Sequence, residues 1–279
     1  MARRPAGRTA GMWWLPAILM AVWPSGHLIA QVAPNRATAY LHPSDVLDAR
    51  AIWVNPAGLG VLREASVYAE LAVAPVGARG RLRQVNAGFN ARGLSFGYQR
   101  DIFDGDVRGH TYRLGLAGSN GRLAAGGAIA HYRGGGAHTS GWDVGITYAA
   151  LSTLTVAAVA ANLGRPVVRG LRQAVTYIPG ATWRPLPAAR FSAHARITTD
   201  SILAYAFGLT LRAGATRRWP LELIVRLDTD AGLRRGAFSV GLSLGAADRF
   251  GIVASTPGDL SAVDAGSVYG LATRQPVRR

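Results

Sequence analysis

The chain of 279 residues contains no cysteine, so neither a disulfide framework nor a thiol metal site is available to it. It also contains no lysine, so every lysine-or-arginine cation is arginine, a bias that fits a GC-rich genome better than selection for phosphate contacts. Only 16% of the residues are charged. Beyond residue 30, no apolar run is long enough to cross a bilayer as a helix. Any crossing of a membrane must therefore be made by strands.

The N-terminus has the pattern of a secretory signal peptide. Arg3, Arg4 and Arg8 are followed by an apolar stretch from Met12 to Trp23. A basic region before an apolar core of about a dozen residues is typical of such signals, whereas a spanning helix needs roughly 20 apolar residues. We predict export, with residues 1–30 removed by cleavage after Ala30.

From residue 64 to residue 273, the chain consists of short stretches in which apolar and polar residues alternate. In one of them, Trp142, Val144 and Ile146 alternate with Asp143 and Gly145. Successive side chains of a strand point to opposite faces, so each stretch has one apolar face and one small or polar face. About fourteen such stretches with no helix between them predict an all-β fold, a transmembrane antiparallel up-and-down β-barrel. The expected strands are 64–73, 82–90, 93–101, 110–118, 122–132, 141–150, 153–162, 172–184, 187–198, 201–213, 219–229, 235–245, 248–255 and 265–273.

The connections between these strands alternate in length, as expected of outer-membrane barrels with short periplasmic turns and longer external loops. A soluble β-sandwich has no reason to alternate in this way, and only the connection near Thr199 and Asp200 breaks the pattern. The expected localisation is therefore the bacterial outer membrane. The long connections are expected at 74–81, 102–109, 133–140, 163–171, 229–234 and 256–264.

The net charge of +16 does not by itself indicate nucleic-acid binding. The arginines are spread over turns and strand ends, rather than gathered on one helix or interleaved with stacking aromatics. At the ends of strands they can stay solvated, or pair with anionic lipid headgroups and the phosphates of lipopolysaccharide. We therefore expect outer-membrane lipid and lipopolysaccharide as partners, and no nucleic acid.

Residues 31–63 precede the first strand and lack the alternation of apolar and polar residues seen in the rest of the chain. Ser44 and Asp45 can cap a short helix, and the run from Asn55 must leave that helix because of its proline and glycines. The string Asp48–Leu59, DARAIWVNPAGL, resembles the N-terminal hatch motif of the FadL-type outer-membrane transport family, which the related PorV/PorQ-like barrels share. The expected hatch residues are Asn55, Pro56, Ala57, Gly58, Leu59 and Gly60.

This resemblance implies a fourteen-stranded barrel (64–273) whose N-terminal segment, residues 31–63, folds into the lumen and obstructs it. Members of the family carry hydrophobic substrates such as long-chain fatty acids or aromatic hydrocarbons. The chain departs from the family's long-chain fatty acid transporters in being shorter. It also ends in a polar tail, residues 274–279, rather than on the aromatic residue that ends many outer-membrane barrels.

The face expected to line the lumen is rich in charge, which favours a wet channel or a network that braces the obstructing segment. A path for a fatty acid would need an apolar pocket instead. We expect Arg196, Glu222 and Arg226 to pair across the lumen. The polar lumen network is predicted to comprise Glu70, Arg113, His194, Arg196, Glu222 and Arg226, with Arg83, Asp143 and Asp228 on the same face.

No catalytic residue, metal ligand or cofactor is predicted. His138 and Ser140 have the spacing of a hydrolytic dyad, but the nearest carboxylate is Asp143, expected inside the lumen. No His, Asp and Glu cluster has metal-ligand spacing, and no glycine-rich phosphate motif occurs. The protein is therefore expected not to be an enzyme.

Two hypotheses of function follow. In the first, a small hydrophobic or amphipathic molecule diffuses passively through a plugged lumen. In the alternative, the chain is a PorV-like structural or secretion-associated barrel, which binds partner proteins at its rim and transports nothing. An apolar pocket beside Asn55–Gly60 would favour the first hypothesis, and a charge-filled lumen the second.

Overall fold

The computed structural model describes residues 30–62, 64–74, 81–104, 107–214, 219–257 and 263–274. The expected signal peptide, apart from Ala30, and the tail beyond Arg274 lie outside these residues. No helix of the described part is long and apolar enough to cross a membrane. The helical elements are α1 (Ala51–Val54) and the 3-10 helix η1 (Pro56–Gly60). The strands are β1 (Ala65–Val73), β2 (Leu82–Ala91), β3 (Leu94–Ile102), β4 (Arg108–Ser119), β5 (Leu123–Gly134), β6 (Ala137–Ala149), β7 (Leu154–Leu163), β8 (Val167–Val168), β9 (Leu171–Arg172), β10 (Thr176–Leu186), β11 (Ala189–Ile197), β12 (Ile202–Ala213), β13 (Leu221–Asp230), β14 (Arg235–Leu244), β15 (Asp248–Pro257) and β16 (Ala265–Arg274).

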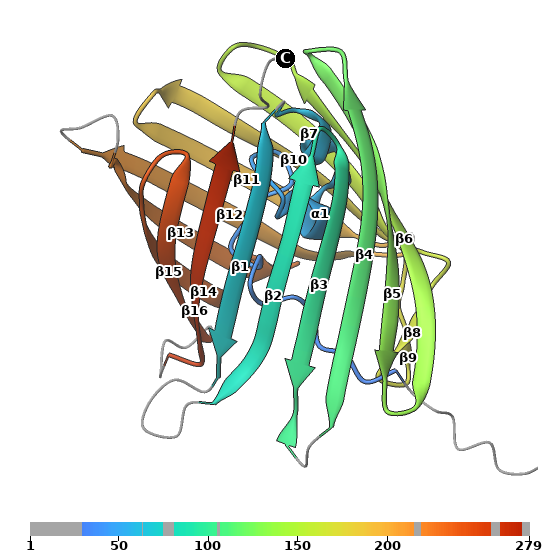
Figure 1. The fold of residues 1–279 in the computed structure, drawn as a ribbon. Helices are drawn as coiled ribbons and strands as arrows, with labels where there is room; N and C mark the ends of the chain where they lie inside the picture. Colours follow the sequence, from blue (N-terminus) through green and yellow to red (C-terminus); the bar gives the residue numbers. More distant parts are fainter. Residues whose placement is uncertain are drawn as a thin grey trace, which may run out of the picture.

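Fourteen of these strands form one closed antiparallel barrel (Figure 1), which confirms the predicted fold class and strand number. Each barrel strand pairs with the next along the chain, except that β7 pairs with β10. The barrel closes where β1 pairs with β16, from Ala65 opposite Arg274 to Val73 opposite Gly266. Strands β8 and β9 form a separate two-stranded sheet within the connection from β7 to β10. Closure leaves no unpaired sheet edge, which a strand surrounded by lipid requires.

The outer surface of the wall is apolar and the inner surface is small or polar. On β6, Trp142 and Val144 are 55% and 48% exposed, whereas Asp143 between them is 8% exposed. On β4, Leu114 and Leu116 are likewise exposed while Arg113 is buried. An exposed apolar belt around a closed barrel is the surface expected of a protein that spans a bilayer.

The two ends of the barrel differ as the alternation of loop lengths predicts, and are called the long-loop end and the short-turn end below (Figure 1). One expected long loop, 133–140, is wrong. Strands β5 and β6 continue to pair up to Gly134 opposite Ala137, so only Gly135 and Gly136 connect them. Their φ values of 59° and 80° are those of a tight hairpin turn, which glycine adopts without a steric cost.

A charge on the outer surface should destabilise the barrel. Val144→Arg would place a guanidinium midway along β6 among lipid tails, and we expect a loss of roughly 2–4 kcal/mol in unfolding free energy. The matched control is Leu151→Arg, in the exposed turn after β6, where the cost should be about 0–1 kcal/mol. Equilibrium denaturation in phospholipid vesicles measures both. Equal losses at the two positions would contradict a lipid-facing β6.

Candidate functional site

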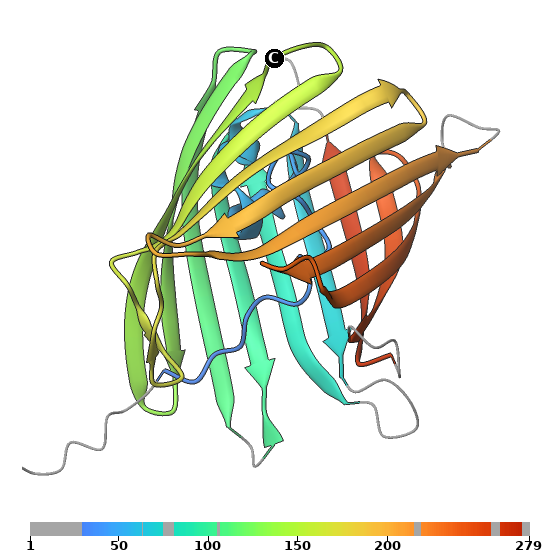
Figure 2. The same cartoon turned by 180° about the vertical axis from the view of Figure 1, so that it is seen from behind.

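Residues 30–62, called the lumen segment below, run through the inside of the barrel between its two ends (Figures 1 and 2). The segment begins at the long-loop end, where Ala30 forms a parallel bridge with Val168. It ends at the short-turn end, just before β1, and η1 there contacts β4, β5 and β6. The path therefore brings most of the lumen segment against the inner wall.

Near the long-loop end, side chains of the wall satisfy the backbone of the extended lumen segment. The Ala33 N–H donates to Asp101 Oδ2 at 2.8 Å, and Gln99 donates back to the Ala33 carbonyl at 2.8 Å. Gln84 donates to the Pro34 carbonyl at 2.6 Å. Because this stretch forms no helix or strand of its own, these bonds replace the ones that regular structure would supply.

At the short-turn end, Asn55 joins three parts of the molecule and is fully buried. Its amide nitrogen donates to the Pro43 carbonyl and to the Thr147 hydroxyl on β6, both at 2.9 Å. Its side-chain oxygen accepts the Ala57 N–H at 3.1 Å and so caps η1. The predicted hatch residue Asn55 thus fixes both the fold of the lumen segment and its attachment to the wall.

Glycines allow the lumen segment and the wall to approach each other closely around η1. A Cβ added at Gly145 of β6 would lie 2.0 Å from Asn55 Oδ1, and one at Gly126 of β5 would lie 2.6 Å from the Pro56 carbonyl oxygen. Within the segment, a Cβ at Gly58 would lie 2.2 Å from the Val46 carbonyl oxygen. None of these positions has room for a larger residue.

An ion pair on the wall holds α1. Arg113 of β4 binds Asp143 of β6 at 2.6 Å and donates to the Ile52 carbonyl at 2.9 Å. Its guanidinium also lies 5.1 Å from the centre of the Trp53 ring. The pair is buried, and the Ile52 carbonyl of α1 supplies one of the hydrogen bonds that a buried guanidinium needs.

A second buried charge pair belongs to the lumen segment itself. Arg50 binds Asp48 at 2.7 Å and donates to the Tyr40 hydroxyl at 2.8 Å. The guanidinium lies 5.0 Å from the centre of the Tyr269 ring on β16. Glu70 of β1 is buried within electrostatic range of this pair.

The middle of the lumen segment is attached to β11 and β13. His42 Nδ1 lies 3.0 Å from His194 Nδ1, and Arg226 donates to the Leu41 carbonyl at 2.7 Å while it pairs with Asp228. Burial, together with the neighbouring Arg226 guanidinium, lowers the pKa of His42 to about 3. His42 is therefore neutral at pH 7 and can share one proton with His194 in a hydrogen bond.

A cavity of about 220 Å³ lies between the lumen segment and the wall formed by β10 to β16. Apolar side chains of the segment, such as Leu41 and Val46, line it together with Ile224. Charged side chains line it as well, among them Asp45, Asp48 and Arg50 of the segment. On the wall, Arg190 and Arg249 both lie 3.6 Å from Glu222 Oε2. The lining mixes charged with apolar side chains and includes none of Asn55–Gly60, so this cavity is not the apolar pocket expected beside the hatch residues.

The structure places the predicted network residues in different groups. Glu70, Arg113, His194, Glu222 and Arg226 are buried on the lumen face, each with the neighbours given above. The expected pairing of Arg196, Glu222 and Arg226 is wrong. The lumen face of β11 brings Arg190 to Glu222 instead, and Arg196 lies exposed beyond His194.

Arg83 is also not on the lumen face. In β2 the buried face is that of Gln84 and Asn86, and Arg83 shares the outward face with Val85. It binds Asp104 at 2.9 Å at the long-loop end. The strand must turn Phe89 and Val85 to the lipid, so Arg83 follows them outward.

Several residues that bind the lumen segment could not be identified from the sequence. Asn90 donates to the Leu59 carbonyl at 3.0 Å, and Ser66 accepts the Ala49 N–H at 2.8 Å. Arg190 and Arg249 could have been found, because alternation places Arg190 on the face of His194. The wall glycines gave no such sign, since glycine occurs on both faces.

No chemistry beyond binding is evident in the described part of the chain. Among these residues no group of three His, Cys, Asp or Glu side chains could hold a metal ion. His131 Nδ1 contacts Ser140 Oγ at 3.0 Å on the outer surface, but no described carboxylate forms a hydrogen bond with that histidine. The dyad considered in the sequence was His138 with Ser140, whereas the structure pairs Ser140 with His131, and this pair lacks an acid that would orient it.

No protein-family model and no curated protein matches this sequence. Among solved structures, the barrel is similar to the toluene transporter TbuX of Ralstonia pickettii, with a TM-score of 0.58 and 10% identity over 84% of this chain and 98% of that one. It is similar to the CymD monoaromatic hydrocarbon channel, with a TM-score of 0.51 and 10% identity over 88% and 97%. It is also similar to the toluene transporter TodX of Pseudomonas putida, with a TM-score of 0.50 and 8% identity over 89% and 100%. At these identities the likeness is one of fold, and it confirms the expected FadL-like outer-membrane barrel architecture.

Proposed function

We propose that this barrel is a passive channel for small hydrophobic or amphipathic molecules, and that the lumen segment is a plug that must shift for the channel to open. The observation that carries the proposal is the cavity of about 220 Å³ beside the lumen segment. An apolar cavity of about 150 Å³ in another protein binds benzene. The present cavity also carries charged side chains, which suits an amphipathic molecule. The solved structures with this fold include toluene transporters and a monoaromatic hydrocarbon channel, which supports the same class of ligand here.

The attachments of the lumen segment support its role as a gate. Asn55 and His42 bind the wall, and Arg113 of the wall binds the segment, each through only a few hydrogen bonds. We therefore expect the segment to detach in steps without unfolding the barrel. The sequence has no energy-coupling motif, and movement of the ligand would then follow its concentration gradient.

A second candidate function is favoured by the charge at the short-turn end. Arg184, Arg190 and Arg249 line the cavity or its mouth together with Glu222. No comparable set of charges is needed to pass a hydrocarbon. A PorV-like scaffold that binds partner proteins at this rim would use it, and would show no uptake.

Filling the cavity should block transport. Thr210 of β12 lines the cavity, and Thr210→Trp would occupy it. Its neighbour Leu211 is 41% exposed on the lipid face, so Leu211→Trp is the matched control. Uptake of a radiolabelled monoaromatic hydrocarbon by cells that express each variant is the measurement. We expect wild type and Leu211→Trp to accelerate uptake and Thr210→Trp to lose most of it. If wild-type cells take up no more than cells without the protein, the scaffold function is correct.

A larger side chain beside Asn55 should weaken the attachment of the plug to the wall. Gly145→Ala places a Cβ against Asn55 Oδ1, whereas a Cβ at Gly127 of β5 would meet only the Asp143 carbonyl at 3.7 Å. We expect hydrogen–deuterium exchange of residues 51–60 to be about tenfold faster or more in Gly145→Ala, since a buried hydrogen bond is worth about 0.5–1.5 kcal/mol and steric strain adds to its loss. Gly127→Ala should exchange as wild type does. Identical exchange in both variants would contradict a close contact between Asn55 and Gly145.

Acid should favour opening. The docked plug holds His42 neutral with a pKa of about 3, whereas a released His42 has the ordinary value of about 6.5. At His42, protons therefore bind the released state better, so this residue should favour release more strongly as pH falls from about 7.5 to about 5. The groups that face His42 are His194, Arg226 and Asp45. Opening frequency in planar bilayers measures the effect, and His42→Gln should remove most of the pH dependence. A wild-type frequency that does not change with pH would contradict the role of His42.

A further inference from the structure

The outer surface of β3 to β6 carries three rows of side chains of different character at the long-loop end. The row in the apolar belt pairs Phe96 with Leu114, Leu114 with Ile129 and Ile129 with Trp142. The rows follow at intervals of two residues, or roughly 7 Å along each strand. In the next row toward the long-loop end, the residues on neighbouring strands are, in order from β3 to β6, Tyr98, Tyr112, His131 and Ser140. In the last row they are Arg100, His110, Arg133 and His138.

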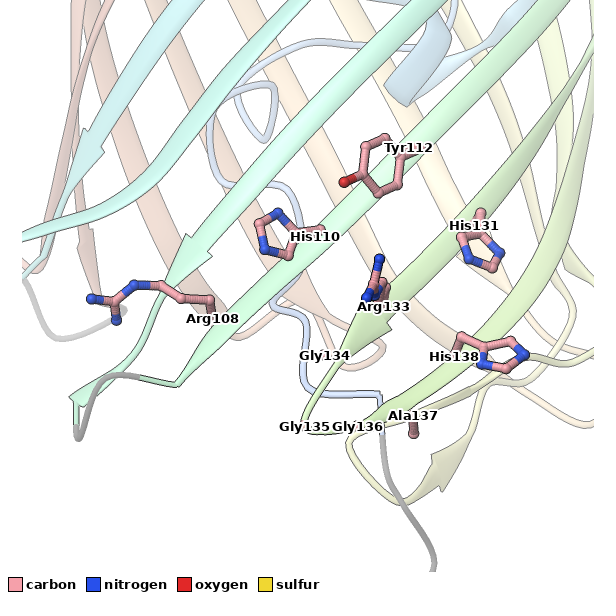
Figure 3. A pocket seen from close by; sticks show the side chains of 10 residues that line it. All are labelled: Arg108, His110, Tyr112, His131, Arg133, Gly134, Gly135, Gly136, Ala137 and His138. Carbon is pink, nitrogen blue, oxygen red and sulfur yellow. The ribbon is translucent and has the colours of Figure 1, made fainter.

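The last two rows are called the basic patch below. Five of their side chains, Tyr112, His110, His131, Arg133 and His138, line an open cavity of about 750 Å³ (Figure 3), and Arg100 lies next to His110 on the neighbouring strand. The side chains come from neighbouring strands beside the turn at Gly135 and Gly136, as Figure 3 shows. Tyr98 and His110 are joined by a hydrogen bond of 2.9 Å, and His131 and His138 lie with ring centres 5.8 Å apart. The patch is thus held in a defined arrangement on rigid strands.

The basic patch is not neutralised from within the described chain. Arg100 and Arg133 are exposed and have no ion-pair partner among the described residues. Asp101, which follows Arg100, points into the lumen and accepts the Ala33 N–H. Asp104 is occupied by Arg83 and Arg81. A ligand for the patch must therefore bring negative charge of its own.

We propose that the basic patch binds the phosphate groups of a glycolipid in the outer leaflet, of the kind found in lipopolysaccharide. The order of the rows matches such a lipid, with acyl chains against Phe96 and Leu114, sugars against the tyrosines and phosphates between Arg100 and Arg133. Arginine is suited to this role because its planar guanidinium binds phosphate oxygens in pairs. The site lies outside the lumen, so this inference does not depend on the proposed transport.

The test is native mass spectrometry of the refolded barrel in detergent, with phosphorylated lipid A as the probe and dephosphorylated lipid A for comparison. We expect wild type to retain the phosphorylated form preferentially. The double variant Arg100→Gln/Arg133→Gln should bind it about tenfold more weakly or worse, because it removes both charge-assisted contacts to phosphate. Heat-modifiable migration in electrophoresis verifies folding. If that variant does not fold, Arg100→Lys/Arg133→Lys keeps the charge, loses the paired geometry and should bind with intermediate affinity.

The matched control is Arg92→Gln/Arg122→Gln, which removes two exposed arginines from the opposite ends of β3 and β5. It should bind lipid A as wild type does. An equal loss in this control would show that only the net charge of the barrel matters and overturn the proposal. Equal binding of the dephosphorylated form would overturn it too. Displacement of lipid A by millimolar inorganic phosphate would mean a site for the free anion and not for a lipid.

Discussion

The structure depends on how the backbone of an irregular segment is satisfied inside a closed barrel. A strand wall uses most of its own N–H and C=O groups for its neighbours, so the backbone of the lumen segment is bound mainly by wall side chains. Gln84 and Gln99 do so near the long-loop end, and Asn90 does so near the short-turn end. The inner face therefore has to be small and polar where the segment passes, and the outer face is left to the lipid.

The same constraint explains why attachment and possible movement are compatible. Each anchor is local, and the barrel closes through β1 and β16 without help from the segment. Loss of the Asn55 or His42 contacts would then open space beside the existing cavity and leave the wall intact. A barrel whose wall is complete in itself can host either a movable plug or a fixed brace, and the ligand-sized cavity favours the plug.

The sequence predicts the barrel well because alternation is repeated in every strand and errors at one strand do not spread. It also marks Asn55–Gly60, since proline and glycine interrupt the helical pattern there. Partners across the lumen could not be predicted, because strand tilt decides that Glu222 meets Arg190 and not Arg196. The expected loop at 133–140 was wrong because of its residue types. Histidine and arginine look like loop residues, but at a membrane rim they belong to strands.

The central claim is that the lumen segment closes an otherwise open barrel. The most direct test is the single-channel conductance of the refolded protein in planar bilayers, compared with a variant that lacks residues 31–60. The account predicts a wild type that is closed for most of the time and a deletion variant that conducts continuously. A deletion variant that folds, as judged by heat-modifiable migration, and still conducts no ions would contradict it.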